Sequence, residues 1–265
     1  MTYTHGHGEA VLASHASRTA ENSAAYLLPY LRPGQRVLDV GCGPATITAD
    51  LAELVAPGEV IGLDNVEAAL DAARATLQAR GVDGVKLVKG DVYELLWPDE
   101  YFDVVHAHQV LQHLPDPVAA LKEMLWVTSP DGIVAARDTI YSAMTWYPQY
   151  EGMAAWQEIY IATARANGGE PDAGSRLKAW CHEAGFDEVT ASASTWCYST
   201  DEERAWWAET WAERCVTSFG PRAVELGLAT RADLEQMAAD WRLWAESRDG
   251  WFAVVHGEVL ALAGN

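Results

Sequence analysis

The feature that most constrains the fold is a regular alternation of short apolar runs and helical stretches between Arg36 and Ala136. Several runs are apolar throughout, as expected of strands buried on both faces of a parallel sheet. The runs as a whole, including those interrupted by one charged residue, lie at residues 37–40, 60–63, 85–88, 102–105 and 132–136. The helices are expected at 44–56, at 66–80 after Asn65 as a cap, and at 117–128 after Asp116 as a cap. This alternation predicts right-handed strand–helix–strand units and a doubly wound α/β sheet.

The second half of the chain is less regular but extends the same sheet. Two further runs, 189–198 and 250–263, predict a seven-stranded, mostly parallel sheet whose last strand is antiparallel. Thr200 and Glu203 form a capping-box pattern that predicts the start of a helix. We expect one domain over residues 1–265, with 1–30 as an N-terminal lid segment and 139–171 and 200–248 as helical insertions covering the active site.

Charge and cysteine usage exclude several classes of protein. The chain has 38 acidic and 18 basic residues, a formal net charge of −20, and no cluster of lysines or arginines. Binding to nucleic acid or to an anionic membrane is therefore not expected, and a neutral or cationic small substrate fits the negative electrostatic field of this chain more easily.

The four cysteines show no C-x-x-C spacing, and the His5-Gly6-His7 pair has no evident third ligand, so no metal site is expected. Met1–Ala10 lacks an apolar run and no run of 18 apolar residues follows, which favours a cytoplasmic location.

The most informative motif ends the first predicted strand. Gly41 and Gly43 form a Gly-x-Gly turn directly before a helix, where glycines allow close approach of a ligand and the helix offers free N–H groups. The turn alone is a weak signal. Thr46 stands where a dinucleotide fingerprint has its third glycine. Asp39 would repel a pyrophosphate but suits a ligand that carries an ammonium group.

Carboxylates also follow the second and third predicted strands. Asp64 can accept both hydroxyls of a ribose, and Gly90-Asp91-Val92 offers a carboxylate and a backbone N–H suited to adenine. The carboxyl ends of parallel strands meet at one edge of the sheet, where open α/β sheets bind ligands. Each feature alone is explained by ordinary turn chemistry. The glycine turn after the first strand, Asp64 after the second and Gly90-Asp91-Val92 after the third, taken in this order, favour a nucleoside site.

Together these motifs resemble those of class I S-adenosylmethionine-dependent methyltransferases, of the branch that includes the ubiquinone and menaquinone C-methyltransferases. The matching segments are Asp39–Pro44, Asp64-Asn65, Gly90–Val92, Phe102–Pro117 and Ala184–Phe186. The chain departs from the pattern at Ala45, where a glycine is common; alanine is small, and we expect no loss of binding.

The resemblance implies S-adenosylmethionine as cofactor and a set of residues that bind it. Asp39 would favour the cofactor ammonium, Asp64 the ribose, and Asp91 the adenine. Arg18 is the nearest cation for the cofactor carboxylate, with a solvated helix face as its alternative. The implied cofactor-binding residues are Arg18, Asp39, Gly41, Cys42, Gly43, Asp64, Asn65, Gly90, Asp91, Val92, His108 and Gln109.

The expected reaction is an in-line displacement at the sulfonium methyl, which needs a positioned nucleophile more than acid–base chemistry. His113 is the candidate base if the acceptor must lose a proton, and a structural role for it in its loop is the alternative. We expect Tyr141, Trp146 and Tyr147 to line an apolar acceptor pocket, although aromatic residues at helical spacing also fit a core.

The leading interpretation is therefore a methyltransferase acting on a small, apolar or aromatic molecule, with no nucleic-acid or membrane partner. One alternative is a member of the same fold that binds the cofactor without methylating. A second is an NAD-dependent oxidoreductase, which Thr46 and Asp39 disfavour. The sequence leaves open the identity of the acceptor, the methylated atom (carbon, oxygen or nitrogen) and the oligomeric state.

Overall fold

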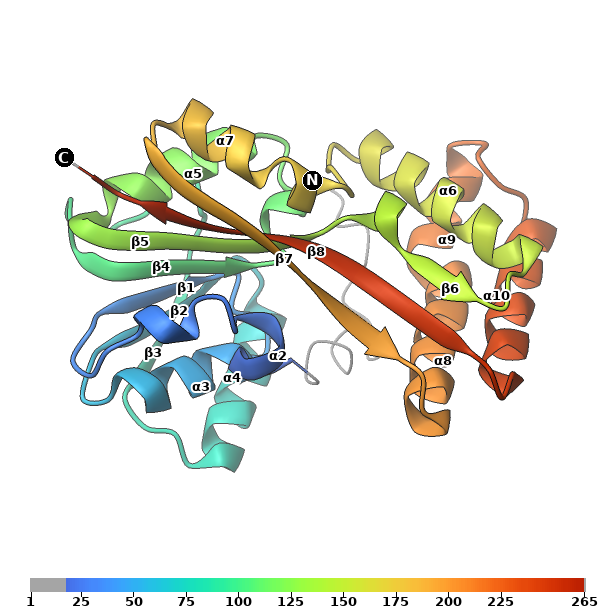
Figure 1. Ribbon diagram of the computed structural model, residues 1–265, viewed down its shortest axis with the longest axis horizontal. Coiled ribbons are helices and arrows are strands. Elements are labelled where there is room, and N and C mark those ends of the chain that lie inside the picture. Colours follow the sequence, from blue (N-terminus) through green and yellow to red (C-terminus); the bar gives the residue numbers. More distant parts are fainter. Residues whose placement is uncertain (1–17, 265) are drawn as a thin grey trace.

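The computed structural model describes residues 18–264 and contains one eight-stranded sheet with helices on both faces (Figure 1). The strands are β1 (Val37–Val40), β2 (Val60–Asp64), β3 (Val85–Lys89), β4 (Phe102–His108), β5 (Thr128–Thr139), β6 (Thr145–Tyr147), β7 (Glu188–Tyr198) and β8 (Trp251–Leu262). Their order is β3-β2-β1-β4-β5-β8-β6, with β7 paired to β8. Strands β1 to β5 pair in parallel and β8 runs antiparallel to both β5 and β7. The predicted mostly parallel sheet with an antiparallel last strand is confirmed.

One strand was not predicted. The segment Thr145–Tyr147, expected to belong to a largely helical insertion, forms β6 and pairs with Trp251–Ala253 at the start of β8. Strand β8 is twelve residues long, and β5 pairs only with its second half, from His256 onward. The rest of that edge would expose unpaired backbone groups, and the Thr-Trp-Tyr sequence has the β-branched and aromatic residues that favour a strand.

Short helices cover each face of the sheet (Figure 1). One face carries α2 (Ala20–Ser23), α3 (Thr46–Val55) and α4 (Glu67–Arg80), and the other carries α5 (Pro117–Trp126) and α7 (Leu177–Ala184). Neighbouring residues of β1 point to opposite sides: Val37 packs with the α3 residues, whereas Leu38 packs with those of α5 and α7. The 3-10 helices are η1 (Leu28–Tyr30), η2 (Leu111–His113), η3 (Tyr141–Ala143) and η4 (Ala173–Ser175).

Four helices form a separate cover at the far ends of β7 and β8. They are α6 (Glu151–Ala166), α8 (Asp201–Thr217), α9 (Phe219–Glu225) and α10 (Arg231–Glu246). They surround an aromatic core whose largest fully buried side chains include Trp156, Trp211, Trp241 and Trp244. Residues 139–171 and 200–248 thus pack as one helical cover, and much of the tryptophan content of the chain stabilises it.

The ends of these helices follow local chemistry. The capping box is present: the Thr200 hydroxyl accepts a hydrogen bond from the Glu203 N–H, and the Glu203 carboxylate accepts one from the Thr200 N–H. Asn65 does not cap α4 as expected. Val66 occupies the cap position without a side-chain bond, and its N–H donates to Asp64 instead. Within residues 18–264, no helix is both long and apolar enough to cross a membrane.

Candidate cofactor- and acceptor-binding site

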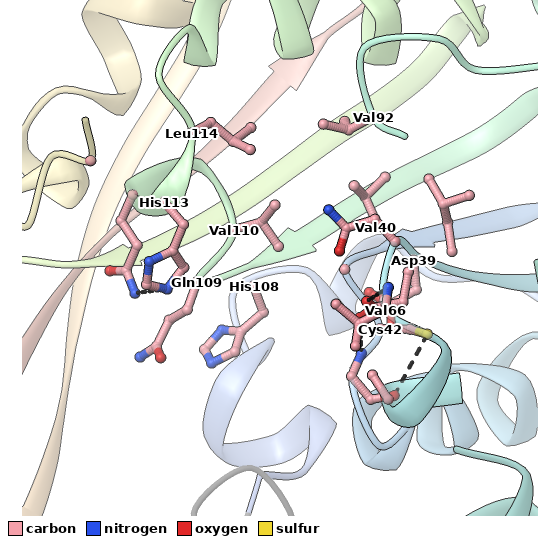
Figure 2. Close-up of a pocket in the computed structure, with 18 of the residues that line it drawn as sticks. Asp39, Val40, Cys42, Val66, Val92, His108, Gln109, Val110, His113 and Leu114 are labelled. Atoms are coloured by element: carbon pink, nitrogen blue, oxygen red, sulfur yellow. Dashed lines mark hydrogen bonds between the residues drawn. The ribbon is translucent and has the colours of Figure 1, made fainter. Parts of the chain in front are cut away.

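A cavity of about 420 Å³ opens at the carboxyl ends of strands β1 to β4 (Figure 2). This volume falls within the usual range for small-molecule sites. Every described residue of the implied cofactor set lines it: Arg18, Asp39, Gly41, Cys42, Gly43, Asp64, Asn65, Gly90, Asp91, Val92, His108 and Gln109. The fold thus gathers side chains from four strand ends, as the order of the motifs predicts.

The loop after β1 brings the backbone close to its neighbours. Gly41 and Gly43 have positive φ values, 65° and 53°. A Cβ on Gly41 would lie 2.5 Å from Cγ2 of Val110, so this position has no room for a side chain. Ala45 also has a left-handed φ, 59°, a conformation that glycine adopts at lower cost.

Asp64 stands at the end of β2 and ties two loops together. Its Oδ2 accepts a hydrogen bond from the Gly43 N–H at 3.0 Å, and its Oδ1 accepts one from the Val66 N–H at 2.9 Å. The carboxylate is half-buried and lines the cavity. A carboxylate has about four lone-pair directions, so one such group can accept several hydrogen bonds at once.

Asp39 is buried, 3% exposed, and each of its oxygens has a side-chain partner. Its Oδ1 lies 2.7 Å from Nδ1 of His106, and its Oδ2 accepts a hydrogen bond from the Thr48 hydroxyl at 2.6 Å. His106 lies on β4 beside Asp39 in the sheet register. His106 and Thr48 were not predicted as site residues, although His106 lies two positions before His108 on the same strand. These partners hold a negative charge at the cavity wall.

The end of β4 supplies a second set of polar groups. Arg18 donates from Nη2 to the Gln109 Oε1 at 2.7 Å, and Gln109 adopts a left-handed φ of 54°. His108 is buried, and neither of its ring nitrogens has a hydrogen-bond partner in residues 18–264. Burial lowers the pKa of His108 well below its ordinary value, and the charge of Arg18 adds to this effect, so the ring is neutral. Figure 2 shows His108, Gln109 and His113 together on one side of the cavity.

His113, the candidate base, lies in η2 and also lines the cavity. Its Nε2 is 3.1 Å from Nε2 of the Gln112 amide. Burial lowers the pKa of His113 to about 3, and the charges of Arg18 and Arg214 contribute in the same direction. The imidazole is therefore neutral at neutral pH, with a low affinity for a proton.

Gln112 fixes the η2 loop against the sheet. Its N–H donates to Oδ1 of Asp138 at 3.2 Å, and its side-chain Oε1 accepts from the Thr139 N–H at 3.2 Å. Burial raises the pKa of Asp138 to about 8. The position of His113 thus depends on a buried carboxyl group that is largely protonated at neutral pH.

Only one of the three expected acceptor residues reaches the cavity. Tyr141 lines it and stacks on Tyr160, with ring centroids 4.3 Å apart. Trp146 instead points into the aromatic core and stacks on Phe252, and Tyr147 is 61% exposed. The cause is strand β6, because successive side chains of a strand point to opposite faces. We therefore withdraw Trp146 and Tyr147 from the acceptor site.

Other residues line the part of the cavity where Trp146 and Tyr147 were expected. Helix α6 and the loop after it form the cavity wall near Tyr141, with Tyr160, Ala164, Asn167, Gly169 and Pro171. This segment was predicted to cover the site, but the side chains that face the cavity were not predicted. The His5–His7 segment and most of the expected lid, residues 1–17, lie outside the described residues. Residues 18–264 contain no group of three or more metal-ligating side chains.

Comparisons with known proteins agree with this geometry. The methyltransferase-domain family matches residues 31–204. An uncharacterized methyltransferase of Schizosaccharomyces pombe is 34% identical over 98% of this chain and 96% of its own length. The demethylmenaquinone methyltransferase of Geobacillus stearothermophilus is 42% identical over 110 residues, 41% of this chain and 47% of its own. Among solved structures, YcgJ of Bacillus subtilis has a TM-score of 0.60 at 18% identity and covers 91% of this chain and 97% of its own.

The chain therefore belongs to the methyltransferase-domain family, as the family match over residues 31–204 shows. The resemblance to class I S-adenosylmethionine-dependent methyltransferases is confirmed. The partial match to a demethylmenaquinone methyltransferase agrees with the branch indicated by the motifs. The S. pombe relative extends the likeness to the helical cover, since it aligns with almost the whole chain.

Proposed function

We propose that this protein transfers a methyl group from S-adenosylmethionine to a small, apolar or aromatic molecule by in-line displacement. The observation that carries the proposal is one continuous cavity with two unlike ends. One end has the strand-end carboxylates Asp39, Asp64 and Asp91, and the other has the aromatic rings of Tyr141 and Tyr160. A cationic cofactor and an apolar acceptor are thereby brought face to face.

The residues of the first end fit the cofactor. The side-chain-free Gly41 and Gly43 leave the loop backbone open to the methionine part, and Asp39 supplies a fixed negative charge for its ammonium. Asp64 lines the cavity and would accept the ribose hydroxyls, and the buried Val92 with Asp91 borders the place for the adenine. When bound, the sulfonium supplies a methyl group whose S–C bond breaks, with its electron pair passing to sulfur, as the bond from the acceptor forms.

The second end positions the acceptor and excludes water. Tyr141 and Tyr160 form a stacked aromatic wall, and Leu114 and Ala164 extend its apolar surface. His113 lies at the same end, and its low pKa suits it to accept a hydrogen bond rather than to retain a proton. We therefore give His113 a positioning role toward the acceptor, with any proton of the acceptor leaving to solvent.

The proposal is tested by following a labelled methyl group. The purified protein is incubated with S-adenosylmethionine that carries a radioactive methyl, together with fractionated small-molecule extracts. We expect label in an organic-soluble product with the wild type and a large loss with Asp64→Ala, while the exposed Asp71→Ala serves as the matched control. Binding of the cofactor without label in any fraction would contradict methyl transfer and favour a cofactor-binding protein that does not methylate.

A further inference from the structure

A small side cavity of about 20 Å³ lies next to the acceptor end of the large cavity. The two share Arg18, Gln109 and Tyr141, so they adjoin each other. The remaining wall of the side cavity comes from the helical cover, chiefly Trp207, Trp211 and Arg214 of α8. Its size suits one water-sized group.

The described residues that line the side cavity include two cations and no carboxylate. Arg214 is only 4% exposed, and its guanidinium lies over the ring of Trp211 at 5.0 Å. Arg18 lies over Trp196 at 5.7 Å. An arginine side chain stays protonated in proteins, so both contribute positive charge whatever their other contacts.

This local charge is opposite to that of the whole chain. The net charge of −20 led us to expect a neutral or cationic substrate, yet the carboxylates that line the large cavity belong to the cofactor end. Exposed charges are screened over about 8 Å at physiological ionic strength, whereas buried ones are screened much less. The reach of Arg18 and Arg214 is seen in His113, whose pKa both lower. The acceptor therefore meets the charges of the buried Arg214 and the half-buried Arg18 more strongly than the acidic surface.

The same wall also carries a neutral hydrogen-bond donor. Trp207 lines the side cavity, is 4% exposed, and its indole N–H has no hydrogen-bond partner among the described residues. A buried N–H without a partner is destabilising, and a ligand oxygen that accepts from it would remove that cost. The neighbouring Trp206 is half-buried and lines neither cavity.

We infer that the side cavity receives an anionic oxygen of the methyl acceptor, held between Arg18, Arg214 and the indole N–H of Trp207. The acceptor is then an aromatic or apolar acid, with a carboxylate or an ionised ring hydroxyl at one end. Its ring lies against Tyr141, which borders both cavities, and its reactive atom faces the cofactor. This inference rests on the proposed function and names the substrate class.

Two isosteric probes test the inference in the protein saturated with S-adenosylhomocysteine. They are 2-naphthoate, which is anionic, and 2-naphthamide, which is neutral, and their affinities are measured by calorimetry or ligand-detected NMR. We expect the wild type to bind the naphthoate at least about tenfold more tightly, as for hydrogen bonds to a charged group. Trp207→Phe keeps an aromatic ring but removes the N–H, and it should weaken the naphthoate by about tenfold and the naphthamide less, because a charged acceptor makes the stronger hydrogen bond. Trp206→Phe is the matched control and should change neither affinity.

A second pair of variants separates charge from packing. Arg214→Gln should abolish the preference for the naphthoate, and Arg214→Lys should keep part of it. Equal or tighter binding of the naphthamide by the wild type would overturn the inference, as would binding of neither probe to a protein that binds S-adenosylhomocysteine. Failure to bind S-adenosylhomocysteine would instead overturn the proposed function, so the two failures are distinguishable.

Discussion

The substitution Asp64→Ala separates the ligand-binding role of this carboxylate from its structural one. Asp64 already accepts two backbone hydrogen bonds, from Gly43 and Val66, and by our account it also accepts ribose hydroxyls. Losing a charged acceptor should weaken binding of S-adenosylhomocysteine by about 1–3 kcal/mol, or about 5- to 150-fold. The half-buried position lets water reach the two freed N–H groups, so the free energy of unfolding should fall by only about 1–2 kcal/mol.

The assay is calorimetric titration with S-adenosylhomocysteine, accompanied by urea unfolding of each variant. Asp71→Ala removes the same charge from an exposed position on α4 and should leave the affinity unchanged. Asp64→Asn should not restore binding, because its NH₂ group would face one of the two backbone N–H donors. An unchanged affinity in folded Asp64→Ala, or an equal loss in Asp71→Ala, would refute the reasoning.

Three further predictions follow from burial. Trp146→Ala should lower the free energy of unfolding by about 3–5 kcal/mol, whereas Tyr147→Ala should change it by less than about 1 kcal/mol; equal losses in urea titrations would refute the placement of these rings. Asp138→Asn should raise stability at pH 8 by about 1–3 kcal/mol, because the raised pKa makes the wild type lose stability as pH rises from about 4 to 8; stability curves of the two proteins that stay parallel over this range would contradict it. The lowered pKa of His113 means that the unfolded state binds one more proton than the folded state between about pH 3 and 6.5. Stability should therefore decrease as the pH is lowered through this range, and His113→Gln should reduce this acid sensitivity in unfolding measurements. An identical acid-unfolding curve would argue against the burial of His113.

The parallel half of the sheet and the cofactor end were predictable because their signals are local. Residues 60–63 form a continuous run without a charged side chain, as expected of a buried strand, and the turn at Gly41 and Gly43 predicts a close approach of the backbone. Parallel topology then places Asp64 and Asp91 at the same edge. The parallel strands were therefore predicted mainly from apolar runs, and the cofactor-binding residues from the residues at the strand ends.

The acceptor end was less predictable because it depends on long-range packing. Whether Trp146 or Tyr141 faces the cavity is decided by the pairing of β6 with β8, more than a hundred residues away. Arg214 and Trp207 reach the site only because α8 folds back over it, and nothing in their local sequence distinguishes them from other residues of an amphipathic helix. Nearness in sequence to the strand end was thus a poor guide to nearness in space.

The hydrogen-bond partners of buried polar residues were partly predictable. Asp39 was identified, but its partners His106 and Thr48 were not, although both lie on elements that were predicted. A buried carboxylate requires hydrogen-bond donors, so the strand and helix beside it were the places to look.

The central claim is tested most directly by a crystal structure of this protein with S-adenosylhomocysteine. Our account predicts the ribose hydroxyls within hydrogen-bond distance of Asp64, the adenine beside Asp91 and Val92, and the sulfur facing the space between His113 and Tyr141. A ribose bound away from Asp64, or a sulfur turned from the Tyr141 end of the cavity, would contradict it.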